Sequence, residues 1–185
     1  MARKKAASLT IRKLDAARRQ LETAITLWFE DGDSVAIHTL TAAGHQVCHG
    51  LIKAVGGKSP FLFDMDRIRP EYHSLYKKLM LKAENFFKHA NTDPYPDAAI
   101  EFIPEVTEVY LLDAVELFLN LNGTCTPLMM AFRFWFIVSH PELVASEALP
   151  ELDEAVAIEF RSIPKKMFLD VFLQYLPRLQ RKLSL

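Results

Sequence analysis

Apolar residues recur at three- and four-residue steps along most of the chain, and no stretch alternates apolar and polar residues as a strand does. This period is that of one face of an α-helix, so the pattern predicts an all-α protein. Clusters of Pro, Gly and Asp divide the chain into segments of helical length. We therefore expect a bundle of about five to seven helices. The predicted helices cover about residues 8–29, 34–55, 70–91, 104–121 and 128–138, and shorter helices follow up to residue 185.

Residues with a preference for helix ends mark several of these boundaries. Ser8 or Thr10 is expected to cap the first helix, and Asp33 the second. The fifth helix is expected to start at Thr126-Pro127, because proline suits the first helical turn. Pro177 is expected to end or kink the last helix, since its ring cannot donate a backbone hydrogen bond.

Two residues inside predicted helices imply particular neighbours. Gly44 costs helix propensity, which suggests that another helix approaches the second helix closely there. Arg133 is a charged residue within the otherwise apolar fifth helix, so it needs a carboxylate partner or a solvent-exposed position. The rest of that helix is apolar nearly all round, so we expect it to be the most buried element or to lie at a subunit interface.

Segment 70–91 has a well-defined apolar stripe, and we interpret it as the helix around which the rest of the chain is organised. Lys82, Asn85 and His89 lie on one side of the stripe, where side chains at the rim of a helix contact are half exposed. A side chain at such a position can reach a substrate and take part in catalysis. Such positions also suit a lysine that extends along apolar surface and a histidine that binds carbonyls near a helix end.

Composition and charge narrow the class of protein. Half of the 185 residues are hydrophobic, enough for one domain over 8–185, which we divide into a main bundle at 8–122 and a C-terminal helical part at 123–185. Residues 1–7 are expected to be a disordered lead. A net charge of −1 gives no general attraction to nucleic acid or to a membrane. Two cysteines, no secretory signal and no apolar run of spanning length predict a soluble, cytoplasmic protein.

The sequence contains neither a glycine-rich phosphate-binding loop nor the nucleophile elbow of hydrolases. One short motif remains as a candidate for function. The motif is Glu84-Asn85-Phe86-Phe87-Lys88-His89-Ala90. It resembles the motif of HEPN domains, which are all-helical, usually dimeric modules common in prokaryotic defence and toxin–antitoxin systems. Ribonuclease members carry an Arg, often followed by a polar residue such as Asn, and a His four to six residues after the Arg. Asn85 and His89 keep the Asn–His spacing, but Glu84 stands where the family has Arg.

The resemblance implies attack of an RNA 2′-hydroxyl, with His89 as general acid or base. Lys82 would stabilise the phosphorane charge in place of the Arg, although lysine lacks the planar fork of arginine. Asn85 would orient His89 or hold a phosphate, and Glu84 would add negative charge where the phosphate must come. We therefore expect a degenerate or weak ribonuclease, or a non-catalytic binding or regulatory protein. A homodimer would bring two motifs into one cleft, and RNA or a protein is the expected partner.

A second hypothesis is a metal-dependent helical-bundle enzyme. His45 and His49 have the i, i+4 spacing that lets two imidazoles reach one ion, and His38 lies two turns before His45. The carboxylates considered for such a site are Glu22, Glu30, Glu105, Glu108 and Glu116. No Glu-x-x-His pair is present, so we expect no tightly bound metal or other cofactor. The histidines are equally consistent with a boundary stripe that is hydrogen-bonded to neighbouring helices. A third hypothesis is a pure protein-interaction domain, and whether the chain is an enzyme stays open.

Overall fold

The computed structural model describes residues 8–58, 71, 73–91, 93–143 and 154–183. These residues form helices and contain no strand, so the all-α prediction is confirmed for them. The helices are α1 (Lys13–Phe29), α2 (Ser34–Ala54), α3 (His73–Lys88), α4 (Val106–Asn122), α5 (Pro127–Ser139), the 3₁₀ helix η2 (Pro141–Leu143), α6 (Glu154–Arg161) and α7 (Lys165–Leu183). Within the described ranges, none of these helices combines the length and the apolar character needed to cross a membrane.

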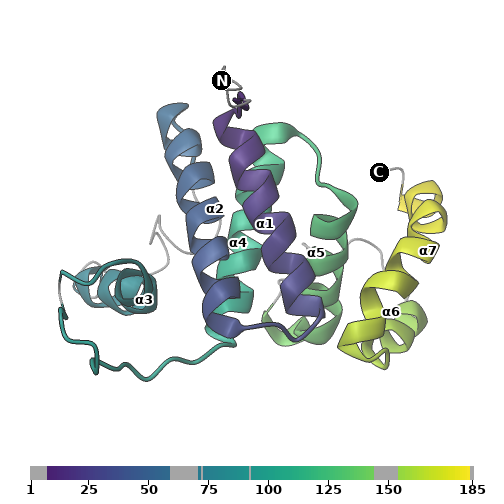
Figure 1. Ribbon diagram of the computed structural model, residues 1–185. Helices are drawn as coiled ribbons and strands as arrows, with labels where there is room; N and C mark the ends of the chain where they lie inside the picture. The colour runs from purple at the N-terminus through teal and green to yellow at the C-terminus, as the bar shows by residue number, and fades with distance from the viewer. Residues whose placement is uncertain (1–7, 59–70, 72, 92, 144–153, 184–185) are drawn as a thin grey trace, which may run out of the picture.

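Four helices, α1, α2, α4 and α5, stand side by side and form the body of the molecule (Figure 1). The antiparallel helices α1 and α2 are joined by a short turn, and α4 packs against α2. Helix α5 contacts α1 and α4, while α6 and α7 cover its other side. Helix α3 lies at the opposite edge of the body and contacts α2.

The core between α1, α5 and α7 is aromatic. Trp28 meets Phe132 edge-on, with ring centroids 5.2 Å apart, and Phe29 stacks on Phe168 at 5.9 Å. Aromatic pairs in these arrangements are favourable beyond the area that they bury. The apolar surface of α5 is thus covered by other helices of the same chain, which accounts for its composition.

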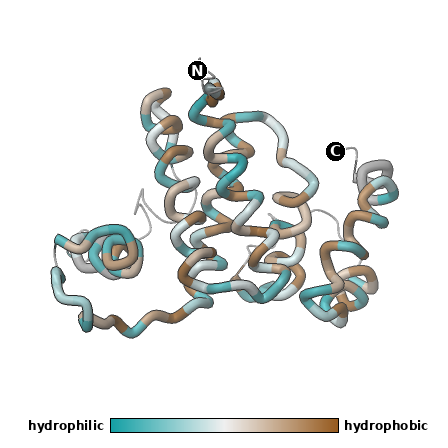
Figure 2. Tube along the Cα trace, viewed as in Figure 1, coloured by the Kyte–Doolittle hydropathy of each residue, from teal (hydrophilic) through white to brown (hydrophobic). Residues whose placement is uncertain are grey.

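The central helix is α4, and not α3. Buried residues face every side of α4, whereas α3 contains both hydrophilic and hydrophobic residues and lies at the edge of the body against α2 (Figure 2). The interpretation of segment 70–91 as the organising helix is therefore wrong. A clear apolar stripe is typical of a helix that is covered on one face, while a helix surrounded by others shows little amphipathicity.

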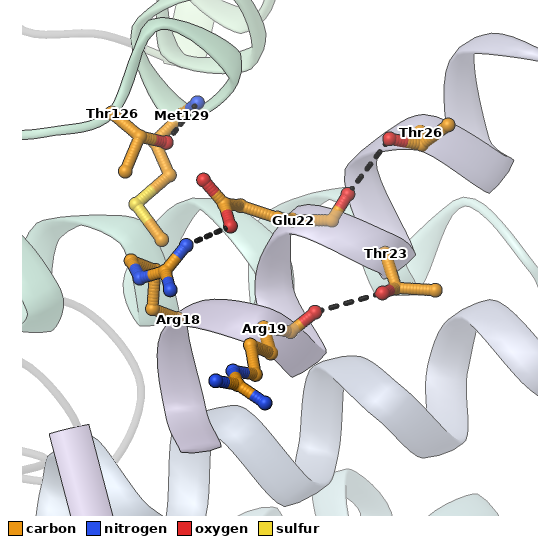
Figure 3. A network of polar contacts seen from close by, with 7 residues as sticks. All are labelled: Arg18, Arg19, Glu22, Thr23, Thr26, Thr126 and Met129. Carbon is orange, nitrogen blue, oxygen red and sulfur yellow. Dashed lines mark hydrogen bonds and ion pairs between the residues drawn. The ribbon is translucent and has the colours of Figure 1, made fainter. Parts of the chain in front are cut away.

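Local rules explain several helix ends and contacts. Asp33 caps α2 by accepting a hydrogen bond from the Ala36 backbone at 2.8 Å, and Thr126 caps α5 in the same way (Figure 3). Gly44 lies where α2 crosses α1: an added Cβ would come within 2.8 Å of the Leu21 side chain. The predicted cap at Asp33, the predicted start of the fifth helix at Thr126-Pro127 and the predicted close approach at Gly44 are confirmed.

The start of α1 differs from expectation. The helix begins at Lys13, so neither Ser8 nor Thr10 caps it. Further along the helix, Arg18 and Glu22 form an ion pair one turn apart (Figure 3).

Of the two outcomes expected at Pro177, an end or a kink, the end is wrong, because α7 continues to Leu183. Proline removes the hydrogen bond to the carbonyl four residues earlier, which belongs to Leu173. Leu173 and Pro177 are both exposed, so water can bind that carbonyl and the helix can continue.

Candidate functional site

The exposed face of α3 carries two of the three residues that the sequence analysis assigned to catalysis. Lys82 and Asn85 line a groove of about 510 Å³ beside the helix. The other described residues of the groove are Ser74, Lys78, Leu81, Phe86, Asp93 and Ile100. His89 is exposed but is not among these lining residues. The structure therefore brings Lys82 and Asn85 together and leaves His89 outside the groove.

Helix geometry explains this separation. Lys78, Lys82 and Asn85 follow one another at four- and three-residue steps, so they share one face of α3. The helix ends at Lys88, and the backbone N–H of His89 donates a hydrogen bond to the Asn85 carbonyl at 3.0 Å. Among the described groove residues, the titratable side chains are two lysines and one aspartate, so the groove offers charge and apolar contact but no general acid–base pair of the predicted kind.

Glu84, at the position where HEPN ribonucleases carry Arg, faces the core. Its side chain is 1 % exposed. It accepts hydrogen bonds from the Tyr110 hydroxyl at 2.8 Å, from the Lys88 ammonium at 2.9 Å and from the amide of Gln46. The expectation that Glu84 adds negative charge where a phosphate must come is wrong, because its carboxylate is buried against α2 and α4 and accepts hydrogen bonds from three donors.

Tyr110 links this carboxylate to a buried polar layer between α2, α3 and α4. Its ring lies 4.6 Å from the His45 ring and 5.7 Å from the His38 ring, measured between centroids. Burial and the neighbouring Glu84 raise the pKa of Tyr110, so its hydroxyl stays protonated and acts as a donor to Glu84.

The histidines of the metal hypothesis belong to the same layer. The Nδ1 atom of His38 lies 2.9 Å from the Thr107 hydroxyl, and the Nε2 atom of His45 lies 2.7 Å from the Asp113 carboxylate. His49 stacks on His45 with centroids 5.8 Å apart. Within the described part of the chain, no group of three His, Cys, Asp or Glu side chains is arranged to hold a metal ion.

The sequence analysis considered these histidines as a stripe at the boundary between core and solvent. Instead, His38, His45 and Asp113 are all at most 1 % exposed. The reason is that α4 is covered on all sides, so its polar residues need partners inside the protein. The His45–Asp113 pair joins residues 68 positions apart, and no local pattern in the sequence predicts such a pair.

Three of the five carboxylates considered as metal ligands have basic partners elsewhere. Glu116 accepts a hydrogen bond from Arg133, which confirms that this arginine in α5 needs a carboxylate. Glu22 is paired with Arg18, and Glu108 lies 3.3 Å from the Nε2 atom of His140.

Both cysteines are unsuited to nucleophilic catalysis. Burial raises the pKa of Cys48 to about 12 and that of Cys125 to about 11. At neutral pH both side chains are thiols, whereas the thiolate is the reactive form.

Comparisons of the chain with models of protein families, with curated proteins and with solved structures find no match. Neither a family nor a relative therefore assigns a role to the groove beside α3.

Proposed function

We propose that the chain is a HEPN-like helical module that acts as a non-catalytic binding protein, and that the groove beside α3 takes an acidic, amphipathic segment of a partner protein. One observation carries the proposal. Glu84 faces the core, while Lys78, Lys82 and Asn85 line the groove on the exposed face of the same helix.

The orientation of Glu84 argues against catalysis. A single donor that stabilises the transition state can be worth about 10²–10³ in rate. Here the residue at the position of that donor is a carboxylate bound to Tyr110, Lys88 and Gln46, so the position cannot contact a phosphate. His89 lies outside the groove, which also separates the expected acid or base from Lys82 and Asn85.

The walls of the groove favour a protein segment. Leu81, Phe86 and Ile100 supply apolar surface, and Lys78 and Lys82 add two positive charges one helical turn apart. A partner helix with acidic residues one turn apart and apolar residues beside them would match both features. RNA is less well matched, because the sequence pI is about 6.6 and the chain lacks the basic surplus typical of nucleic-acid-binding domains.

The proposal is tested with a fluorescent synthetic helical peptide that carries Glu at i, i+4 next to Leu at i+3 and i+7. We expect saturable binding in a fluorescence anisotropy titration. The double variant Lys78→Glu/Lys82→Glu should weaken binding about tenfold or more, since two attractive contacts become repulsive.

The matched control is Lys13→Glu/Lys53→Glu, which makes the same charge change at exposed positions of α1 and α2 outside the groove. It should leave the affinity nearly unchanged, and a peptide with Lys in place of each Glu should not bind. A single-stranded RNA of mixed sequence is titrated in parallel. Tighter binding of RNA than of the peptide, lost in Lys78→Glu/Lys82→Glu, would replace the proposed partner by RNA. Failure of both ligands to bind would reject the groove as a binding surface.

A further inference from the structure

A second pocket, of about 230 Å³, lies where four helix ends meet. The end of α1, the starts of α2 and α4 and the first residue of α7 contribute to its wall. It shares no described lining residue with the groove beside α3. The function proposed above does not use this pocket.

The pocket wall is acidic. Asp31, Glu105 and Glu108 line it, together with one basic residue, Lys165. Two basic side chains that do not line the pocket also approach these carboxylates: the Lys166 ammonium lies 3.5 Å from Asp31, and His140 lies 3.3 Å from Glu108. Burial raises the pKa of Glu108, although His140 and Lys165 act in the opposite direction. Additional positive charge in the pocket would therefore stabilise the ionised form of Glu108.

The position of Lys165 shows how an ammonium group fits there. Its Nζ atom lies 4.4 Å from the centroid of the Trp28 ring and forms an ion pair with Asp31. An aromatic face next to a carboxylate is the combination with which proteins recognise ammonium ions. The Lys165 side chain is 32 % exposed and starts α7, so it can turn into solvent when another cation competes for the same place.

From this geometry we propose that the pocket binds a small aliphatic diammonium compound. One ammonium group replaces Lys165 between Trp28 and Asp31, and the other is held by Glu105 and Glu108, which lie one turn apart on α4. The size of the pocket agrees with a short ligand. At about 30 Å³ per water molecule, the volume equals that of roughly eight waters and falls below the range typical of drug-sized ligands.

The two tryptophans of the chain provide a direct readout. Trp135 is not among the lining residues, so Trp135→Phe leaves Trp28 as the only tryptophan and makes fluorescence report on the pocket. Titration with 1,4-diaminobutane at constant ionic strength should change the emission of Trp28 and saturate. Butylamine, with one ammonium group, should bind about tenfold more weakly, because it makes no ion pair with Glu105 and Glu108.

Two matched pairs of variants, made in the Trp135→Phe chain, decide the mechanism. Lys165→Ala should tighten diamine binding about threefold or more because it removes the competing cation, whereas Lys53→Ala makes the same charge change at an exposed position outside the pocket and should have a smaller effect. Glu105→Gln should weaken binding, and Glu101→Gln, at an exposed position outside the pocket, should not.

The absence of a saturable change in Trp28 emission would overturn the proposal, and so would equal effects within each pair. If Lys165→Ala does not fold, the Glu105 and Glu101 variants, which change exposed side chains, still decide the question.

Discussion

Glu84 is an acceptor for three donors at a position that is nearly closed to solvent. Buried carboxylates are rare unless they are paired and hydrogen-bonded, and Glu84 meets both conditions. Its contacts join α3 to α2 through Gln46 and to α4 through Tyr110. The residue therefore fixes the helix whose other face carries the groove.

We predict that Glu84→Ala destabilises the protein by about 1–3 kcal/mol, because Tyr110 and Lys88 lose their buried acceptor. Glu84→Gln keeps an acceptor oxygen for Tyr110 and should cost less. Chemical denaturation gives the free energies of unfolding, and hydrogen exchange should show faster opening of α3 in Glu84→Ala. Lys82→Ala, at an exposed position of α3, is the control and should change stability by less than about 0.5 kcal/mol. A neutral Glu84→Ala variant would mean that these contacts do not hold α3.

His38 makes stability depend on pH. Burial lowers the pKa of His38 below its ordinary value of 6.5. Between the lowered pKa and about 6.5, the unfolded chain binds more protons at this residue than the folded chain does, so the stability of the fold decreases as the pH falls through that range.

The prediction is tested by comparing the free energy of unfolding of the wild type and of His38→Gln at pH 7.5 and pH 5. The wild type should lose more stability than the variant on acidification, with a difference of up to about 1.4 kcal/mol per pH unit. Equal losses would show that His38 does not contribute to the pH dependence.

At the scale of the element, the contact between α1 and α2 provides an internal comparison. An added Cβ at Gly44 meets Leu21 at 2.8 Å, but one at Gly50, further along the same helix, meets nothing within 4 Å. Gly44→Ala should therefore destabilise the protein by about 1–3 kcal/mol through overpacking. Gly50→Ala should stabilise it by about 0.5–1 kcal/mol through helix propensity. Thermal and chemical unfolding measure both changes, and stabilisation by Gly44→Ala would contradict the close helix packing.

The sequence predicted where helices form better than how they pack. Periodicity and capping residues, such as Asp33 and Thr126, act within a few residues and are visible along the chain. Gly44 and Arg133 also indicated their surroundings, because each would be unfavourable in a helix without a particular neighbour. The central position of α4 was missed, since burial on all sides removes the periodic signal that identifies an amphipathic helix.

The candidate site was only partly accessible to sequence reasoning. Helical spacing placed Lys82 and Asn85 on a common exposed face of α3. It did not show that α3 ends before His89 or that Glu84 has a partner as distant as Tyr110. The His45–Asp113 pair was missed for the same reason, because pairs between helices depend on packing across many residues.

At the scale of the whole molecule, the homodimer stays a prediction. The apolar surface of α5, which first suggested it, is covered by helices of the same chain. The prediction now depends on the resemblance to HEPN modules. Light scattering at high micromolar concentration should give twice the chain mass of 21.1 kDa. A monomer would remove the model in which two α3 motifs share one cleft, although the groove of each chain could still bind a partner.

The absence of RNA cleavage is the central claim, since Glu84, at the position of the family's Arg, is buried and faces away from the groove. The most direct measurement is the cleavage of single-stranded RNA of mixed sequence by the wild type and by His89→Ala. We expect both proteins to give the rate of the buffer alone, because no arginine accompanies His89 and His89 lies outside the groove. Cleavage by the wild type that His89→Ala abolishes would contradict the account and restore the ribonuclease hypothesis.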